Sequence, residues 1–120
     1  MARILVIDDE RLVRASIAAV LGANGHVVLL AVNGREGLER LDNGNFDLVI
    51  TDLVMPEMGG IETIRAIRRQ WRGVRILAMS GGGRQGGDAG AVAARLDADG
   101  ELRKPFSNSQ LLDEVNRAIG

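Results

Sequence analysis

The chain has no cysteine and no tyrosine, and aromatic residues make up only 2% of its 120 residues. Without cysteine, the protein has no disulfide bonds, no thiolate metal site and no cysteine nucleophile. With so few aromatic rings, it has little to stack against a flavin or against the bases of a nucleic acid. These absences argue against a flavin protein and against a nucleic-acid-binding module.

A strong net charge and long apolar runs are also missing. The formal net charge is -1, with 26% charged and 46% hydrophobic residues, which is the balance of an ordinary globular domain. Such a balance gives no overall attraction toward nucleic acids or acidic membranes. No apolar run approaches the length of a membrane span, and the first residues lack the layout of a signal peptide. We therefore expect a cytoplasmic protein that binds no membrane and, by itself, no nucleic acid.

Short apolar runs rich in β-branched residues alternate with segments of helical periodicity. This alternation predicts one α/β domain over residues 1–120, with a parallel sheet, helices on both faces and no output domain. We expect the doubly wound, flavodoxin-like strand order 2-1-3-4-5. The expected strands cover residues 3–7, 26–32, 47–51, 74–79 and 100–103, and the expected helices about 11–23, 33–43, 60–71, 90–96 and 107–120.

Two of the expected helices begin with a recognisable capping sequence. Asn33 and Glu36 have the spacing of a capping box, as do Ser107 and Gln110. Phe106, one residue before the second box, is spaced to form a hydrophobic staple over the first turn of the last helix.

Carboxylates stand where two of the expected strands end. Asp8 and Asp9 follow the first strand, and Asp52 follows the apolar run of the third. In the order 2-1-3-4-5 these strands are neighbours, so their acids would converge at the crevice where such folds bind ligands. A cluster of this kind either shifts its pKa values or binds a cation. An all-oxygen ligand set favours Mg²⁺ or Mn²⁺, although each aspartate taken singly could merely cap a helix.

Two further polar side chains end strands at the same edge. Ser80 follows the fourth strand, and Lys104, the only lysine of the chain, follows the fifth. A hydroxyl, an ammonium group and a divalent cation around one carboxylate form an arrangement that binds a phosphoryl group, and Asp52 could then attack phosphorus. Singly, Ser80 could be an ordinary loop serine and Lys104 a solvated surface charge.

Together these motifs resemble the receiver domain of bacterial two-component response regulators, and the resemblance covers essentially the whole chain. The matching motifs are Asp8-Asp9 after Ile4–Ile7, Asp52 with Met55-Pro56 and Gly60, Ser80 after Met79, and Lys104-Pro105-Phe106.

The resemblance implies a signalling domain rather than an enzyme. Asp52 would accept a phosphoryl group from the phosphohistidine of a sensor histidine kinase or a histidine phosphotransfer protein. Mg²⁺ would be bound by Asp9 directly, by Asp8 through water, by Asp52, and by the backbone carbonyl of Val54. Lys104 would be the counter-cation and Ser80 the switch hydroxyl, with a cis peptide bond before Pro105.

The chain departs from most receivers at Glu101, at Asp97 and in a glycine-rich stretch, and Val54 occupies a position that helps to set the rate of dephosphorylation. Glu101 stands where an aromatic residue is usual, and because an unpaired buried carboxylate is costly, we expect it to stay at the surface. The glycine-rich stretch 81–90 predicts a loose start to the fourth helix, which phosphorylation would tighten. Val54 cannot orient an attacking water, which predicts slow loss of phosphate. In addition, Asp97 replaces a common glycine.

Three other functions remain open on the sequence. A small Mg²⁺-dependent phosphatase with an aspartyl-phosphate intermediate would use the same acids, but the Asp-x-Asp pattern typical of such enzymes is absent at Asp52-Leu53-Val54. A flavodoxin-like cofactor protein is disfavoured by the scarcity of aromatics. The chain could also be the receiver fragment of a larger DNA-binding regulator or hybrid kinase.

Overall fold

The computed structural model describes residues 1–55, 58–81 and 98–120. The strands are β1 (Arg3–Ile7), β2 (Val27–Ala31), β3 (Leu48–Asp52), β4 (Arg75–Ser80) and β5 (Gly100–Arg103). The helices of the described part are α1 (Arg11–Ala23), α2 (Gly34–Asp42), α3 (Gly60–Gln70) and α5 (Asn108–Ile119). No helix within these ranges is long and apolar enough to cross a membrane.

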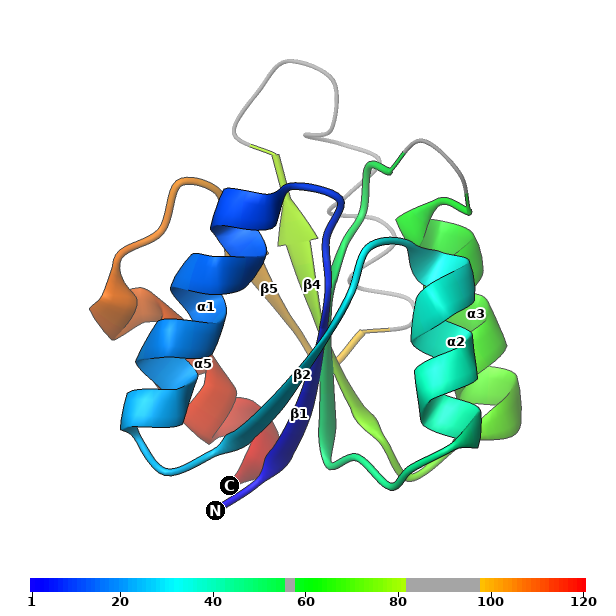
Figure 1. The fold of residues 1–120 in the computed structure, drawn as a ribbon, viewed down its shortest axis with the longest axis horizontal. Coiled ribbons are helices and arrows are strands. Elements are labelled where there is room, and N and C mark those ends of the chain that lie inside the picture. Colours follow the sequence, from blue (N-terminus) through cyan, green and yellow to red (C-terminus); the bar gives the residue numbers. More distant parts are fainter. Residues whose placement is uncertain (56–57, 82–97) are drawn as a thin grey trace.

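The five strands form one parallel sheet in the order β2-β1-β3-β4-β5. Helices α1 and α5 cover one face of the sheet, and α2 and α3 cover the other (Figure 1). The predicted flavodoxin-like fold, its strand order and the placement of helices on both faces are therefore confirmed. The reversal of strand order between β1 and β3 opens the crevice in which folds of this type bind ligands.

Alternate residues of the central strands enter two separate hydrophobic cores. In β3, Val49 packs under α2 and α3, whereas Leu48 and Ile50 pack under α1 and α5. Because side chains of a strand point to opposite faces in turn, a strand buried on both sides must be apolar throughout. All five residues of β3 are buried, which explains why this strand has the clearest sequence signal.

The predicted helix starts form, with one difference in detail. The Ser107 hydroxyl accepts from the Gln110 N–H and the Gln110 side chain accepts from the Ser107 N–H, which completes the capping box. At α2, Asn33 Oδ1 accepts from the Glu36 N–H at 2.8 Å. Glu36 Oε1, however, accepts from the N–H of Val32 rather than that of Asn33. The Glu36 side chain therefore links α2 to Val32, the residue that follows β2.

Several predictions fall on residues outside the described part of the chain. These are the helix expected over residues 90–96, the glycine-rich segment from residue 82 onward with its tightening on phosphorylation, and the positions of Pro56 and Asp97. They stay predictions.

Asp99 joins the last strand to the rest of the sheet. Its carboxylate accepts from the Ile76 N–H at 2.8 Å and from the Arg68 guanidinium, and its own N–H donates to the Ile76 carbonyl. Burial alone would raise the pKa of Asp99, but the hydrogen bonds from Ile76 and Arg68 outweigh it and lower the pKa. The ionised form is therefore the one that the fold stabilises.

Asp99→Asn tests this link. Because the folded-state pKa is lowered, the stabilising effect of Asp99 is present above the pKa of the unfolded chain and is lost as pH falls through the folded-state value. We expect the substitution to cost about 1–2 kcal/mol at pH 7 in urea unfolding, and much less at about pH 2.5. Asp42→Asn, at an exposed position, is the matched control. An equal cost of Asp99→Asn at both pH values would contradict the account.

Candidate functional site

The polar residues predicted to form a site are brought together by the register of the parallel strands. Ile7 pairs with Thr51, which sets Asp8 beside Asp52 on the neighbouring strand. On the other side of β3, Asp52 pairs with Met79, and Ser80 pairs with Arg103, the residue before Lys104. Because all strands are parallel, their carboxyl ends share one edge of the sheet, and these side chains gather there.

Three carboxylates form the centre of the cluster. Oxygen atoms of Asp8, Asp9 and Asp52 all lie within 4.8 Å of one another, a spacing that could hold a metal ion. Asp8 is fully buried and Asp52 is 5% exposed, whereas Asp9 is exposed. The predicted convergence of these acids therefore occurs, with one of the three open to solvent and able to receive a hydrated cation.

Lys104 reaches into this cluster from the end of β5. Its ammonium group lies 2.9 Å from Asp8 Oδ2 and 3.2 Å from Asp52 Oδ2, and donates a hydrogen bond to each. Glu10 Oε1 lies farther away, at 3.5 Å. The peptide bond between Lys104 and Pro105 is cis, as the resemblance implied. The sole lysine of the chain is thus bonded to acids that follow strands one and three.

The charges of the cluster do not balance. Three carboxylates face one ammonium group, which leaves two negative charges uncompensated when all are ionised. Burial raises the pKa of Asp52, and the nearby Asp8 charge adds to this effect, although Lys104 opposes it. Burial alone would lower the pKa of Lys104, but its bond to Asp8 and the charge of Asp52 outweigh it and raise the pKa. A cation beside the acids would therefore be electrostatically favoured.

Backbone groups and neighbours that the sequence did not single out hold the acids in place. Asp8 Oδ1 accepts from the Glu10 N–H at 2.8 Å, and Arg14 Nη1 donates to the Asp8 carbonyl at 2.7 Å. Asp52 Oδ1 accepts from the Val54 N–H at 3.3 Å, while the side chain of Val54 is exposed. Nothing in the spacing of Arg14 indicates its bond, because it lies on the next helix and its partner is a backbone atom.

Gly60 explains part of the spacing after Asp52. Its N–H donates to the Leu53 carbonyl at 3.1 Å. A Cβ atom at this position would meet the Asp52 carbonyl oxygen and the Leu53 backbone, neither of which is free to move aside. A glycine is therefore required where α3 begins directly against the loop that follows β3.

Two polar side chains near the site have no partner for a buried atom. Ser80 is buried at the end of β4, and its Oγ has no hydrogen-bond partner in the part of the chain that the structure describes. Glu101 is half-buried, and its Oε2 is buried and equally unpartnered there. The expectation that Glu101 stays at the surface is therefore wrong for this oxygen. Position 101 lies within β5, where the side chain is half-buried.

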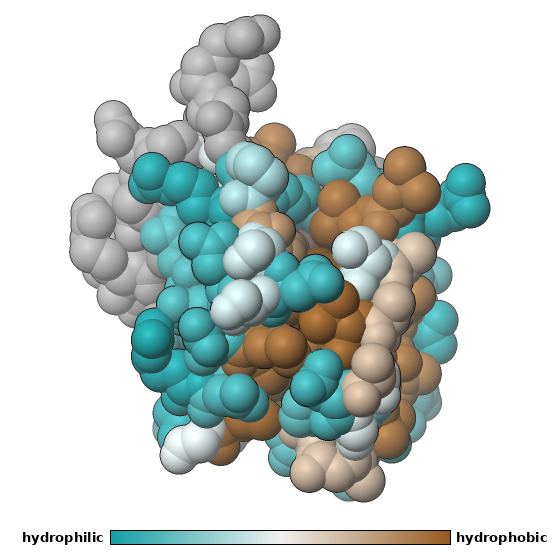
Figure 2. Space-filling view, turned by 90° about the vertical axis from the view of Figure 1, so that its left-hand side faces the viewer, coloured by the Kyte–Doolittle hydropathy of each residue, from teal (hydrophilic) through white to brown (hydrophobic). Residues whose placement is uncertain are grey.

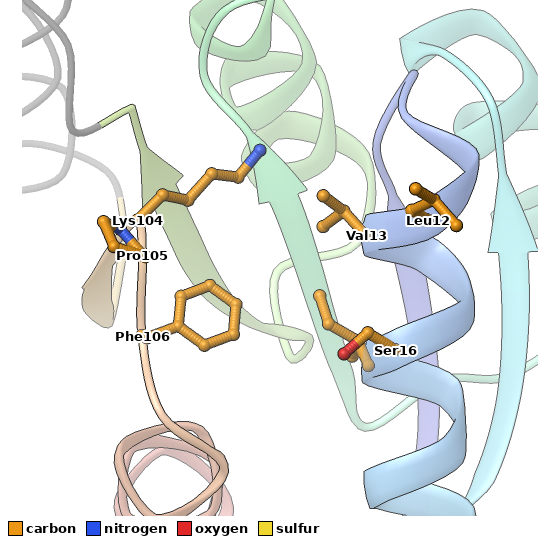
Figure 3. A pocket seen from close by; sticks show the side chains of 7 residues that line it. Leu12, Val13, Ser16, Lys104, Pro105 and Phe106 are labelled. Atoms are coloured by element: carbon orange, nitrogen blue, oxygen red, sulfur yellow. The ribbon is translucent and has the colours of Figure 1, made fainter.

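An apolar cavity of about 590 Å³ has Lys104 in its lining. Figure 3 shows the chain from Lys104 to Phe106 on one side of it and α1 on the other. Leu12, at its rim, is 76% exposed, and Figure 2 shows apolar surface among hydrophilic residues on this side of the molecule. The cavity is lined by Leu12, Val13, Ser16, Ile17, Lys104, Pro105 and Phe106.

Comparison with known proteins identifies relatives along nearly the full chain. The family model described as the response regulator receiver domain matches residues 4–116. The chemotaxis protein CheY of Bacillus subtilis is 34% identical, with 98% of this chain and 97% of CheY covered. The response regulator MprA of Mycolicibacterium vanbaalenii is 36% identical, but only 50% of it is covered. The chain thus spans about half the length of several curated relatives that it matches.

A solved structure gives the same fold with a ligand present. The response regulator TrrA of Thermotoga maritima, in complex with Mg²⁺ and BeF, is 32% identical and aligns with a TM-score of 0.84, covering 98% of this chain and 99% of TrrA.

Replacing Lys104 by Met tests the charge balance of the cluster. Methionine keeps an unbranched apolar stem but leaves Asp8 and Asp52 buried without their ammonium partner. Breaking a buried ion pair on one side costs about 3 kcal/mol, which urea unfolding in the presence of a chelator measures. Arg103→Met, at the exposed neighbouring position, is the control and should change stability by less than about 0.5 kcal/mol. Equal stability of the two variants would show that Lys104 does not compensate the acids.

Proposed function

The chain belongs to the response regulator receiver domain family, and we propose on that basis that Asp52 is its phosphoacceptor, with Mg²⁺ as the required cation. Receivers are signalling domains of two-component systems rather than classical enzymes. The proposal assigns the family's phosphoacceptor chemistry to residues of this chain, and the observation that carries it is the group formed by Asp8, Asp9, Asp52 and Lys104.

The ligands proposed for Mg²⁺ are carboxylate oxygens of Asp9 and Asp52, the backbone carbonyl of Val54, and Asp8 through water. Mg²⁺ prefers oxygen ligands and keeps several waters, and the exposed Asp9 leaves room for them. When bound, Mg²⁺ would neutralise charge on the phosphoryl oxygens and on the acids. The Mg²⁺ in the TrrA structure supports this assignment for a relative of similar length.

The proposed reaction transfers a phosphoryl group to a carboxylate oxygen of Asp52. The bond from phosphorus to the donor nitrogen breaks, a bond from phosphorus to the Asp52 oxygen forms, and the electron pair stays on the departing imidazole. Lys104, now bonded to Asp8 and Asp52, would then pair with a phosphoryl oxygen. The Ser80 hydroxyl, which has a donor to spare, would bind another.

The proposed donor is the phosphohistidine of a sensor histidine kinase or of a histidine phosphotransfer protein, in keeping with the family. The solvent-facing acid Asp9 is three residues from Leu12, which lines an apolar cavity together with Lys104. A protein that brings a phosphohistidine to Asp52 would therefore meet an open site beside an apolar surface. The output would be a change in a protein-binding face, since aromatic residues that could stack on nucleic acid make up only 2% of the sequence.

Intact-mass analysis after incubation with acetyl phosphate and Mg²⁺ tests the proposal. We expect the native chain to gain one phosphoryl group and Asp52→Asn to gain none. Asp47→Asn, an exposed acid at the opposite end of β3, should react like the native chain. Chelation of Mg²⁺ should abolish the gain. Equal labelling of the native chain and Asp52→Asn would refute the assignment.

The residue two positions after Asp52 should control how fast the phosphoryl group is lost. Val54 is 54% exposed and apolar, so it offers no hydrogen bond to orient an attacking water. We expect Val54→Asn to speed dephosphorylation roughly tenfold by positioning that water, and Val54→Ala to leave it nearly unchanged. The decay of the phosphorylated mass with time measures both rates. A Val54→Asn rate no faster than that of Val54→Ala would contradict this role.

A further inference from the structure

The Ser80 hydroxyl and the Glu101 carboxylate are not bonded to each other in the structure, and we propose that a rotation of these side chains joins them while no phosphoryl group is present. Glu101 is then a positioning residue that competes with the phosphoryl group for one donor. The inference rests on the proposed function, because the competition requires a phosphoryl group on Asp52. It gives a role to a carboxylate that stands where most receivers have an aromatic residue.

The first observation is that both groups lack a partner. Across residues 1–55, 58–81 and 98–120, Ser80 Oγ and Glu101 Oε2 are the buried side-chain polar atoms without a hydrogen bond. Ser80 as a whole is 3% exposed. Leaving a buried polar group unsatisfied costs about 1–3 kcal/mol, and more if the group is charged. Each group therefore gains from any complementary partner within reach.

The second observation is that the two side chains project from the same face of the sheet. In β4, Ile76 and Ala78 belong to the core under α2 and α3, whereas Leu77 and Met79 belong to the core under α1 and α5. Side chains alternate along a strand, so Ser80 is on the side of Ala78.

The same reasoning applies to the neighbouring strand. Leu102 of β5 belongs to the core under α1 and α5, so Glu101 projects to the opposite face, which is that of Ser80. The two unpartnered atoms therefore belong to side chains on one face of two paired strands.

The register sets the distance between them. Ser80 pairs with Arg103, and Glu101 precedes Arg103 by two residues. Paired strands lie about 4.8 Å apart and two residues advance about 6.6 Å along a strand, so the two Cα atoms are about 8 Å apart. A glutamate extends far enough along its strand for its carboxylate to meet a serine hydroxyl on that diagonal. Rotation of side chains alone is needed.

The backbone on either side is held in place. The Lys104 N–H donates to the Ser80 carbonyl at 2.8 Å, which fixes the end of β4 to the residue after β5. The competing cation on the same face, Arg103, is exposed and is two residues from Glu101. Because the strands cannot separate easily, the hydroxyl can change partner without a change in the sheet.

The chemistry of a serine hydroxyl makes the two partners exclusive. It has one hydrogen to donate, and both the Glu101 carboxylate and a phosphoryl oxygen on Asp52 are charged acceptors that form strong bonds with it. Phosphorylation would draw the hydroxyl away and release the Glu101 carboxylate at the edge strand β5. Glu101 would therefore weaken binding of the phosphoryl group. By linkage, binding of the phosphoryl group would change the position of the Glu101 carboxylate on the edge strand β5.

The test is a double-mutant cycle on beryllofluoride binding, formed from beryllium and fluoride salts in the presence of Mg²⁺ and followed by ¹⁹F NMR. The four proteins are the native chain, Glu101→Ala, Ser80→Ala and the double variant. We expect Glu101→Ala to tighten binding about tenfold when Ser80 is present and less than twofold when it is absent. Glu101→Gln, whose amide oxygen is a weaker acceptor, should lie between the native chain and Glu101→Ala.

Each other outcome overturns the inference. If Glu101→Ala tightens beryllofluoride binding equally with and without the Ser80 hydroxyl, the Glu101 charge simply repels the ligand. If Glu101→Ala does not tighten binding, Glu101 does not compete for the hydroxyl. If Glu101→Gln behaves like Glu101→Ala, the negative charge rather than the hydrogen bond is responsible. Failure of the native chain to bind beryllofluoride at all would remove the proposed function and this inference together, whereas binding that is indifferent to Glu101 would remove the inference alone.

Discussion

The bond of Lys104 to two buried carboxylates is the interaction on which the arrangement of the site depends. Asp8 and Asp52 come from neighbouring strands, and each would be costly to bury ionised without a cation. Lys104 lies 2.9 Å and 3.2 Å from them, and it also follows the strand on the far side of β4. One ammonium group thus connects the ends of β1, β3 and β5.

This constraint connects the strength of the fold to its chemistry. The strand order brings Asp8 and Asp52 together, and Lys104 compensates part of their negative charge. The third acid, Asp9, adds a further negative charge and is exposed to solvent, so the site keeps a net negative charge and is accessible. A site with that net negative charge favours binding of a divalent cation. The bound cation and the Lys104 ammonium group together would then favour binding of a phosphoryl group. The Lys104 ammonium group lowers the free-energy cost of burying Asp8 and Asp52, and the proposed phosphoacceptor chemistry uses the same group.

The sequence was sufficient to predict a parallel sheet and where its strands end, for a physical reason, whereas the strand order was inferred from the usual order of doubly wound sheets and is confirmed. A strand buried on both faces has a run of apolar residues, and in β1 and β3 the first charged residue after that run, Asp8 or Asp52, marks the end of the strand. The capping box at Ser107 is equally local. What the sequence did not reveal are side-chain bonds to backbone atoms, such as the bond of Glu36 to the Val32 N–H and that of Arg14 to the Asp8 carbonyl, because a backbone partner leaves no mark in the residue types. Glu101 was expected at the surface because burial of an unpaired carboxylate is costly, and one of its oxygens is nevertheless buried.

The most direct measurement of the central claim is the position of a bound cation. In crystals soaked with Mn²⁺ as a stand-in for Mg²⁺, the account predicts an anomalous scattering peak within bonding distance of Asp9 and Asp52, with Lys104 still beside the same acids. Saturating Mn²⁺ that leaves no peak there, or binds only elsewhere on the surface, would contradict the claim that these acids share a cation.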